Sequence, residues 1–350
     1  MARRKHRARQ RAGSDGARSA RHGQLGRATA APAVTAASRP LLSWAALGVV
    51  YFVWGGTYLA IRVGDRHLPP LVLAGTRYVV AGGLLYPIAL RVRATSRAAG
   101  PAGPRRPGLR AWLAGGLVGI LLLSMGNGGV TVAETRLPSG LAAVLVATVP
   151  LWMLLFAWPL RHQRLAWRSV LGLVAGLAGV GVLTGGGAAS GHLSGVLIVL
   201  GAAVAWGFGS VLSHRLPLPS DAMVSAAIEM LVGGAVLILG AVVSGELSRV
   251  HLSSVPATSW IALAYLVVLG SVLAFTAYGY ALKHLPVATV STYAYVNPVV
   301  AVAAGALLLG EHVTWSEALG ALLVVGSVAM TLRRAPARTT GDDGKPPQPA

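Results

Sequence analysis

The sequence has no cysteine and little charge. Without cysteine the chain cannot form a disulfide, a thiolate metal site or a cysteine nucleophile. Only 11% of its 350 residues are charged, whereas about 25% is usual in soluble globular domains. With 54% hydrophobic residues and a mean hydropathy of +0.64, the composition excludes an ordinary soluble domain and indicates a membrane protein.

The motifs of several enzyme classes are also lacking. The sequence contains no Walker A motif, no HExxH and no GxSxG. Glu229 is the single acid that we expect deep in the bilayer, so a carboxylate pair for glycoside hydrolysis is missing. We therefore expect neither an enzyme nor a nucleotide-driven pump, and no cofactor or bound metal.

Long apolar stretches are the main feature that is present. Ten are long enough for a helix to cross about 30 Å of hydrocarbon, which takes about 20 residues. They lack the alternation that is typical of barrel strands. The stretches predict an all-α polytopic membrane protein with ten transmembrane helices. They cover approximately residues 41–61, 69–90, 111–133, 138–158, 169–187, 194–213, 222–243, 259–281, 286–309 and 315–332.

The positive charges are distributed unequally between the two sides of these spans. Twenty-five of the 30 Lys and Arg residues fall on the side that holds both termini, and four fall on the other side. The positive-inside rule places both termini in the cytoplasm of a multi-pass inner-membrane protein. We expect residues 1–40 to be a disordered basic tail that contacts anionic lipid rather than nucleic acid, and residues 334–350 to be a second disordered tail.

The chain contains an internal repeat that divides the spans into residues 41–190 and 191–333. Each copy holds five spans, and an odd number of crossings makes the second copy enter the membrane from the opposite side. Inverted repeats are typical of transporters that open alternately to the two faces of the membrane. The matches are, at an offset of 152 residues, Trp54-Gly55 with Trp206-Gly207 and Arg77 with Glu229, and, at an offset of 148 residues, Pro150 with Pro298, Gln163 with Glu311 and Trp167 with Trp315.

Two ionisable residues, Arg77 and Glu229, are predicted inside the spans, where each costs at least about 2.5 to 3.5 kcal/mol to insert. They are candidates for an alternating ion pair, for a substrate-carboxylate anchor at Arg77, or for a proton-coupling carboxyl at Glu229. The structural alternative is that both side chains snorkel to opposite headgroup layers.

Uncharged polar, aromatic and proline residues complete the predicted substrate pathway. Pro150 and Pro298 each remove a backbone donor, which frees a carbonyl one turn earlier. Because Tyr293, Tyr295 and Asn297 alternate, at most two of them can face the same pathway. The remaining candidates are Trp54, Thr57, Tyr58, Asn127, Thr148 and Trp206.

Four features support a family resemblance by their order and repetition. They are Trp54-Gly55, the Pro70 to Arg77 spacing, Pro150, and the run from Gly310-Glu311 through Trp315 to Gly320. In these features the chain resembles the EamA-like, ten-span branch of the drug/metabolite transporter superfamily. The resemblance implies secondary transport of small metabolites or drugs, often outward, with the substrate held between the two halves.

The expected function is therefore export of a small metabolite or drug-like compound, such as an amino acid or a relative of one, by alternating access. The expected partners are this substrate and the lipid bilayer, with protons as a candidate coupling ion. Spans five and ten offer a candidate homodimer face. The alternatives are a membrane-embedded enzyme, a lipid-handling protein or a passive channel on the same scaffold.

Overall fold

The computed structural model describes residues 38–95, 106–161, 171, 174–175, 178, 182, 193–285, 290, 292–310, 312 and 315–332. By its internal contacts the chain divides into two compact units, residues 1–42 and residues 43–350. The packing described below is that of the second unit. Within the described residues every regular element is a helix.

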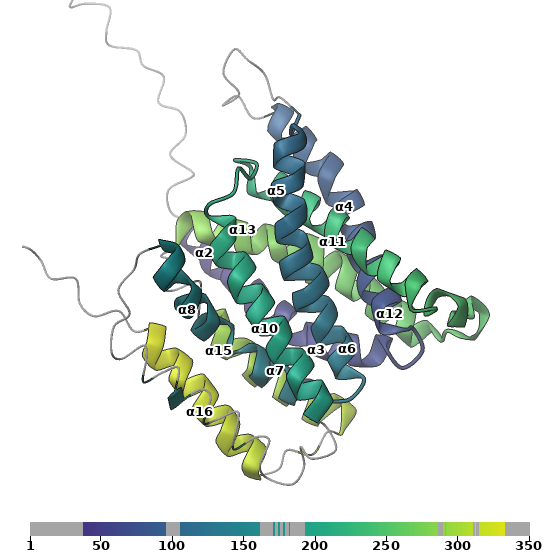
Figure 1. Ribbon diagram of the computed structural model, residues 1–350, viewed down its shortest axis with the longest axis vertical. Coiled ribbons are helices and arrows are strands. Elements are labelled where there is room, and N and C mark those ends of the chain that lie inside the picture. Colours follow the sequence, from purple (N-terminus) through teal and green to yellow (C-terminus); the bar gives the residue numbers. More distant parts are fainter. Residues whose placement is uncertain are drawn as a thin grey trace, which may run out of the picture. The chain divides into compact units, whose positions relative to one another are not determined.

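Figure 1 shows the elements of the first half in their order along the chain. Two of its membrane helices contain a wider, π-helical segment, here labelled η, so that each is built from three consecutive elements. The elements are α2 (Ser38–Val49), η1 (Val50–Trp54), α3 (Gly55–Gly64), α4 (Pro70–Thr95), α5 (Leu109–Gly119), η2 (Ile120–Asn127), α6 (Gly128–Glu134), α7 (Ser139–Val146) and α8 (Val149–Arg161).

The second half repeats this construction, with one π-helical segment, η5, and two short 3-10 turns, η3 and η4, in a loop. Its elements are α10 (Leu193–Ser213), α11 (Ala222–Val243), η3 (Leu247–Arg249), η4 (Leu252–Ser254), α12 (Ala257–Val267), η5 (Val268–Leu273), α13 (Ala274–His284), α15 (Tyr293–Leu309) and α16 (Trp315–Leu332).

Seven helices in the described part of the chain are long and apolar enough to cross a membrane. They coincide with predicted spans one to four and six to eight, and they confirm the all-helical polytopic fold. Val296–Leu309, within the ninth predicted span, is a shorter apolar helix, and α16 forms at the tenth. The fifth predicted span falls almost entirely outside the described residues, so the count of ten stays a prediction. The seven spans are Pro40–Gly64, Pro70–Ala94, Leu109–Glu134, Ser139–Ala157, Leu193–Ser213, Ala222–Val243 and Ala257–Ala281.

Local sequence explains where several helices begin and end. Pro70 begins α4, where its missing N–H costs nothing. The Asp221 Oδ1 accepts hydrogen bonds from the backbone N–H groups of Met223 (2.9 Å) and Val224 (3.2 Å), which caps the start of α11. Gly310 follows α15 with φ of 66°, a left-handed conformation that stops a helix and favours glycine.

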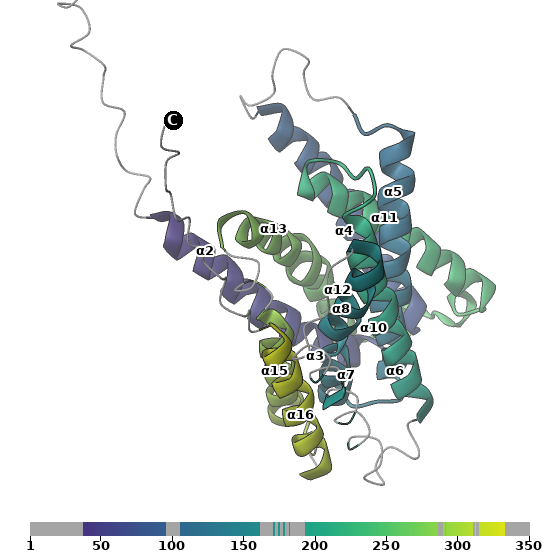
Figure 2. The same cartoon turned by 60° about the vertical axis from the view of Figure 1, so that its left-hand side comes forward.

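Small residues allow α4, α5 and α11 to pack closely, and Figure 2 shows the three side by side. A Cβ added at Gly82 of α4 would lie 2.9 Å from the Leu231 backbone nitrogen of α11. A Cβ at Gly234 of α11 would lie 2.7 Å from the Val79 backbone nitrogen of α4. Such small-residue contacts are the usual way in which membrane helices approach each other.

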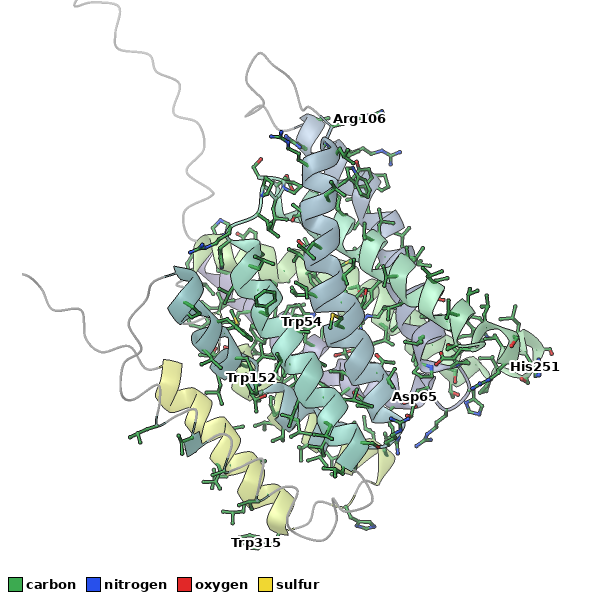
Figure 3. The ribbon with its side chains drawn as sticks, in the orientation of Figure 1. Trp54, Asp65, Arg106, Trp152, His251 and Trp315 are labelled. Atoms are coloured by element: carbon green, nitrogen blue, oxygen red, sulfur yellow. The ribbon has the colours of Figure 1, made fainter. Side chains whose placement is uncertain are left out.

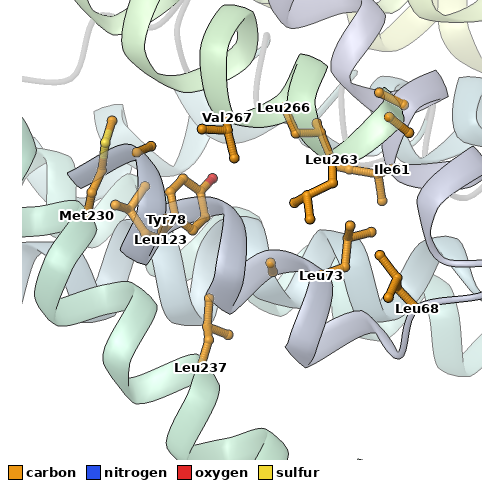
Figure 4. Close-up of a cluster of buried hydrophobic side chains, with 14 of the residues drawn as sticks. Ile61, Leu68, Leu73, Tyr78, Leu123, Met230, Leu237, Leu263, Leu266 and Val267 are labelled. Carbon is orange, nitrogen blue, oxygen red and sulfur yellow. The ribbon is translucent and has the colours of Figure 1, made fainter. Parts of the chain in front are cut away.

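A buried cluster joins this group of helices to α12 (Figure 4). Tyr78 of α4 has no exposed surface and packs in the same cluster as Leu123 of η2 and Met230 of α11. Leu73 and Leu266 extend the cluster from α4 to α12. Because Arg77 directly precedes Tyr78, this packing fixes the turn of α4 that carries the charge.

Candidate functional site

A cavity lies between helices of both halves. It contains about 870 Å³ of space free of protein atoms, counting its open mouth. Its wall is made by residues of η1, α3, α4, η2, α6, α7, α8, α10, α13 and α15.

Ten of the thirteen residues that the sequence predicts for the pathway line this cavity. The structure brings these residues together around one cavity, and their contact with a substrate stays a prediction. The ten are Trp54, Thr57, Tyr58, Arg77, Asn127, Pro150, Trp206, Tyr293, Asn297 and Pro298.

Of the other three predicted residues, Thr148 and Glu229 lie outside the described cavity wall. The Thr148 hydroxyl is buried, donates to the Leu145 carbonyl oxygen (2.7 Å) and accepts from Trp152 Nε1 (3.3 Å). Glu229 is absent from the wall, and its Oε1 accepts a hydrogen bond from the Ser225 hydroxyl (2.9 Å). Tyr295 lies in α15, and its side chain falls outside the described residues.

Arg77 is the charged residue of the cavity wall, and only 2% of its surface is exposed. Its Nε donates to the Ser271 hydroxyl (3.0 Å), one Nη to the Asn127 Oδ1 (3.3 Å) and the other Nη to the Gly270 carbonyl oxygen (3.4 Å). The guanidinium carbon lies 4.8 Å from the centre of the Tyr78 ring. All these partners are neutral, and Glu229 accepts its hydrogen bond from Ser225 instead.

The π-helical segments explain how Arg77 is held. The wider turn of a π-helix displaces backbone groups from the regular ladder and is frequent at functional sites. Asn127 is the last residue of η2, while Gly270 and Ser271 belong to η5. Two irregular segments, one from each half, therefore supply the hydrogen-bond acceptors for one buried cation.

Trp54, the last residue of η1, joins the same arrangement from the other side. Its Nε1 donates to the Gly270 carbonyl oxygen (3.1 Å). Its ring lies 5.2 to 5.3 Å from the ring centres of Phe275, Tyr278 and Tyr293. In Figure 3 Trp54 lies in the interior among the helices, whereas Asp65 lies near helix ends.

The two predicted prolines lie where the helices around the cavity are irregular. The fourth span is divided into α7 and α8 by a turn at Ala147 and Thr148, just before Pro150. Pro298 lies inside α15, so it cannot donate to the carbonyl of Ala294 one turn earlier. Pro150, Ala147, Pro298 and Ala294 all line the cavity.

Positions related by the repeat meet at the cavity. At the offset of 152 residues, Trp54 and Trp206 both line it. At the offset of 148 residues, the first residue of η2, Ile120, corresponds to the first residue of η5, Val268. Four pairs of residues at this offset line the cavity. They are Asn127 with Phe275, Val146 with Ala294, Val149 with Asn297 and Pro150 with Pro298.

Glu134 is a buried acid that the sequence analysis missed. We expected the third span to end at residue 133, but Glu134 closes α6 inside that span and has no exposed surface. Arg62 of α3 donates through one Nη to the Glu134 backbone carbonyl. The spacing offered a signal: Asn127, Val130 and Glu134 share one helical face, and the first two line the cavity.

Asp65 lies just beyond the first span, at the C-terminal end of α3. Burial raises the pKa of its carboxyl from 3.8 to about 7, although the nearby Arg62 and Arg66 act to lower it. Its Oδ2 is buried without a hydrogen-bond partner. The negative end of the α3 dipole also disfavours a carboxylate at this position.

The described residues include no group of three or more His, Cys, Asp or Glu side chains that could hold a metal ion. The polar groups at the cavity instead suit a small organic ligand, because a few hydrogen-bonding groups converge within a largely apolar wall.

Comparisons with known proteins agree with this construction. A family model, the EamA-like transporter family, matches residues 42–185 and again residues 193–333. A solved crystal structure, described only as a protein, is 23% identical with a TM-score of 0.56, and the match covers 85% of this chain and 99% of that chain. That likeness concerns the fold alone.

Curated relatives carry the names of transporters rather than of enzymes. The uncharacterized inner membrane transporter YedA of Escherichia coli (strain K12) is 40% identical over 289 residues, which cover 81% of this chain and 89% of YedA. A probable terminal-alkyne amino-acid exporter of Streptantibioticus cattleyicolor is 28% identical, with 83% of this chain and 93% of the exporter covered. A probable amino-acid metabolite efflux pump of Salmonella typhimurium is 26% identical, with 80% and 91% covered.

These matches and the seven apolar helices describe a multi-pass inner-membrane transporter. The chain belongs to the EamA-like transporter family of the drug/metabolite transporter superfamily.

Proposed function

We propose that this protein is a secondary transporter that exports a small organic acid, such as an amino acid, and binds it in the cavity. The observation that carries the proposal is the buried guanidinium of Arg77 at the cavity wall, held by neutral acceptors. A buried cation favours a nearby anion, and arginine binds carboxylates through paired hydrogen bonds. A substrate carboxylate would supply the charge that this wall lacks.

The rest of the cavity suits a compact, partly apolar molecule. Trp54, Tyr58, Trp206 and Phe275 line it together with small residues. Such a wall of aromatic and small side chains favours a compact, partly apolar ligand.

Several features support alternating access. Repeat-related residues of both halves line one cavity, and helices on either side of it are irregular at Pro150 and Pro298. Two inverted halves, residues 41–190 and 191–333, that tilt about a central site can expose it to each face in turn. With both termini in the cytoplasm, the end of the cavity near Glu134 faces outward.

Two further observations support outward, gradient-driven movement. Relatives are named as an amino-acid exporter and as an amino-acid metabolite efflux pump. The sequence contains no Walker A motif to use ATP. The energy would therefore come from the substrate gradient or from a coupled ion.

Counterflow in proteoliposomes tests this function. Vesicles that contain the full-length protein are loaded with L-phenylalanine and diluted into labelled L-phenylalanine, and phenethylamine serves as the matched probe without a carboxylate. We expect saturable uptake of the amino acid alone. Arg77→Gln should lower this uptake by about 10-fold to 100-fold, because a charged hydrogen-bonded pair is worth about 1.5 to 3 kcal/mol.

The control variant is Arg136→Gln, since Arg136 is an exposed arginine outside the cavity. It should transport normally. Equal exchange of phenethylamine, or full activity of Arg77→Gln, would contradict the carboxylate anchor. Uptake that rises linearly with concentration would indicate a channel instead of a carrier.

A further inference from the structure

Glu134 lies one helical turn beyond the cavity wall. Asn127 and Val130 line the cavity, and Glu134 follows Val130 by four residues on the same face of α6. One turn of helix is about 5.4 Å long. On this helix, the side chain that follows the cavity wall is thus a fully buried carboxyl.

The neighbouring helix α3 has the same arrangement. Tyr58 lines the cavity, and Arg62 follows it by four residues. Arg62 donates through Nη to the Glu134 backbone carbonyl, which ties α3 to α6 at this level. The Tyr58 phenol and the Glu134 carboxyl also interact electrostatically. Tyr58 is therefore a cavity residue that interacts electrostatically with the buried acid.

Among the elements packed against α6, α3 and α4 carry charged residues. The elements η2, α7 and α10, which pack against α6, contain no charged residue. A buried carboxyl in such surroundings is stable either as the neutral acid or as the ion compensated by a neighbouring cation. The charged or titratable groups on the remaining elements around it are Tyr58, Arg62 and Asp65 at α3, Arg136 after α6, and Arg77, Tyr78, Tyr86, Arg91 and Arg93 on α4.

We propose that Glu134 is the proton-binding site that couples this transporter to the proton gradient. A hydronium ion in the cavity gives a proton to the Tyr58 hydroxyl, which passes its own proton to the Glu134 carboxylate. The hydronium becomes water, the Tyr58 hydroxyl is restored and Glu134 becomes the neutral acid; release reverses these steps. Arg62 stabilises the ionised form. The proposal depends on the proposed transport function, and it assigns to Glu134 the role that the sequence suggested for Glu229, which binds Ser225 away from the cavity wall.

The first test needs no substrate. Infrared difference spectra of the full-length protein in lipid, between about pH 5 and about pH 9, report buried carboxyls that change protonation. We expect a titrating carboxyl signal that Glu134→Gln removes and that the matched variant Glu229→Gln retains. An unchanged signal in Glu134→Gln, or its loss in Glu229→Gln, would overturn the assignment.

A second variant keeps the test decisive if Glu134→Gln does not fold. Tyr58→Phe retains the carboxyl but removes the hydroxyl that interacts electrostatically with it, so the midpoint of the titration should move by at least about half a pH unit. An unmoved midpoint would contradict the proposed contact between the cavity and Glu134.

Transport then separates the two proposals. A pH gradient should stimulate L-phenylalanine movement by the unsubstituted protein, and Glu134→Gln should lose this stimulation while it retains counterflow. Absence of counterflow in the unsubstituted protein would count against the transport proposal and leave the infrared result to decide on Glu134. Full stimulation in a folded Glu134→Gln protein would refute the coupling role.

Discussion

The Nε1 of Trp54 donates a hydrogen bond to the Gly270 carbonyl oxygen, 3.1 Å away and 216 residues along the chain. The same carbonyl accepts from an Nη of Arg77 (3.4 Å). Gly270 lies in η5, where the π-helical turn displaces backbone groups from the regular ladder. One backbone oxygen of the second half thus orients two side chains of the first half at the cavity.

We expect Trp54→Phe to lower thermal stability and to weaken L-phenylalanine binding. The phenylalanine ring retains most of the aromatic contacts but cannot donate to Gly270. Hydrogen bonds between membrane helices average about 0.6 kcal/mol and reach about 1.7 kcal/mol, so the loss of stability should be modest. Thermal unfolding followed by circular dichroism, together with counterflow, measures both effects.

The control for this variant is Trp260→Phe, because Trp260 is an exposed tryptophan outside the cavity. Its effects on stability and on L-phenylalanine binding should be much smaller than those of Trp54→Phe. Unaltered binding in Trp54→Phe would show that the Gly270 hydrogen bond does not orient the cavity wall.

Asn127→Asp should weaken the binding of a carboxylate substrate more than Asn127→Ala does. The Asn127 Oδ1 lies 3.3 Å from an Nη of Arg77, so an aspartate there would form an ion pair with the guanidinium. The internal carboxylate would then compete with that of the substrate. Alanine removes one acceptor of the guanidinium without adding a charge, so its effect on the substrate carboxylate should be smaller.

The concentration of L-phenylalanine that half-saturates counterflow reports this competition. We expect at least about a 10-fold increase for Asn127→Asp, and only about a 2-fold to 10-fold increase for Asn127→Ala. Equal values for the two variants would mean that Arg77 does not bind the substrate carboxylate.

The spans and the composition of the cavity wall could largely be predicted from the sequence. Apolar length is a property of single segments, so seven predicted spans recur as suitable helices. The cost of burying Arg77 and the repetition of Trp54 and Pro150 in the second half also depend on sequence alone. Arg77, Trp54 and Pro150 all line the cavity, as expected for a charge or an irregular helix inside a membrane.

The parts that the sequence could not predict depend on contacts between helices. Counting residues placed Glu229 within a span, but it could not tell that α11 lies outside the cavity wall described above. Thr148 instead hydrogen-bonds within its own turn. Glu134 was missed because a span boundary one residue too short assigned it to a loop. The π-helical segments have no composition that distinguishes them from their neighbours.

Asp65→Asn should stabilise the protein at alkaline pH. The folded-state pKa of Asp65 is raised from 3.8 to about 7, so the folded protein holds a proton that the unfolded chain has lost between these values. Stability therefore falls as the pH rises through this window, and the asparagine variant escapes that loss. We expect equal melting temperatures for the two proteins near pH 4. Near pH 8, about one pH unit above the folded-state pKa, the variant should have the higher melting temperature.

Thermal unfolding followed by tryptophan fluorescence across this pH range measures the difference. Arg66→Gln offers a matched test, because Arg66 acts to lower the pKa of Asp65. It should destabilise the protein near neutral pH in the native background and have no such effect in the Asp65→Asn background. A stability difference between the native protein and Asp65→Asn that does not change with pH would contradict the burial of an ionisable carboxyl at this helix end.

Gly119→Ala should destabilise the packing of α5 on α11, whereas Gly83→Ala should not. A Cβ at Gly119 would lie against the backbone carbonyl of Glu229, with the carbonyl carbon at 2.8 Å, and a backbone group cannot rotate away as a side chain can. A Cβ at Gly83 of α4 meets nothing within 4 Å. Overpacking of this kind typically costs about 1 to 3 kcal/mol, while alanine in an open helical position is favoured over glycine by about 0.5 to 1 kcal/mol. The melting temperature should therefore fall in Gly119→Ala and rise in Gly83→Ala. A shift of the same sign in both variants would show that α5 and α11 do not approach each other as closely as the contacts of Gly119 indicate.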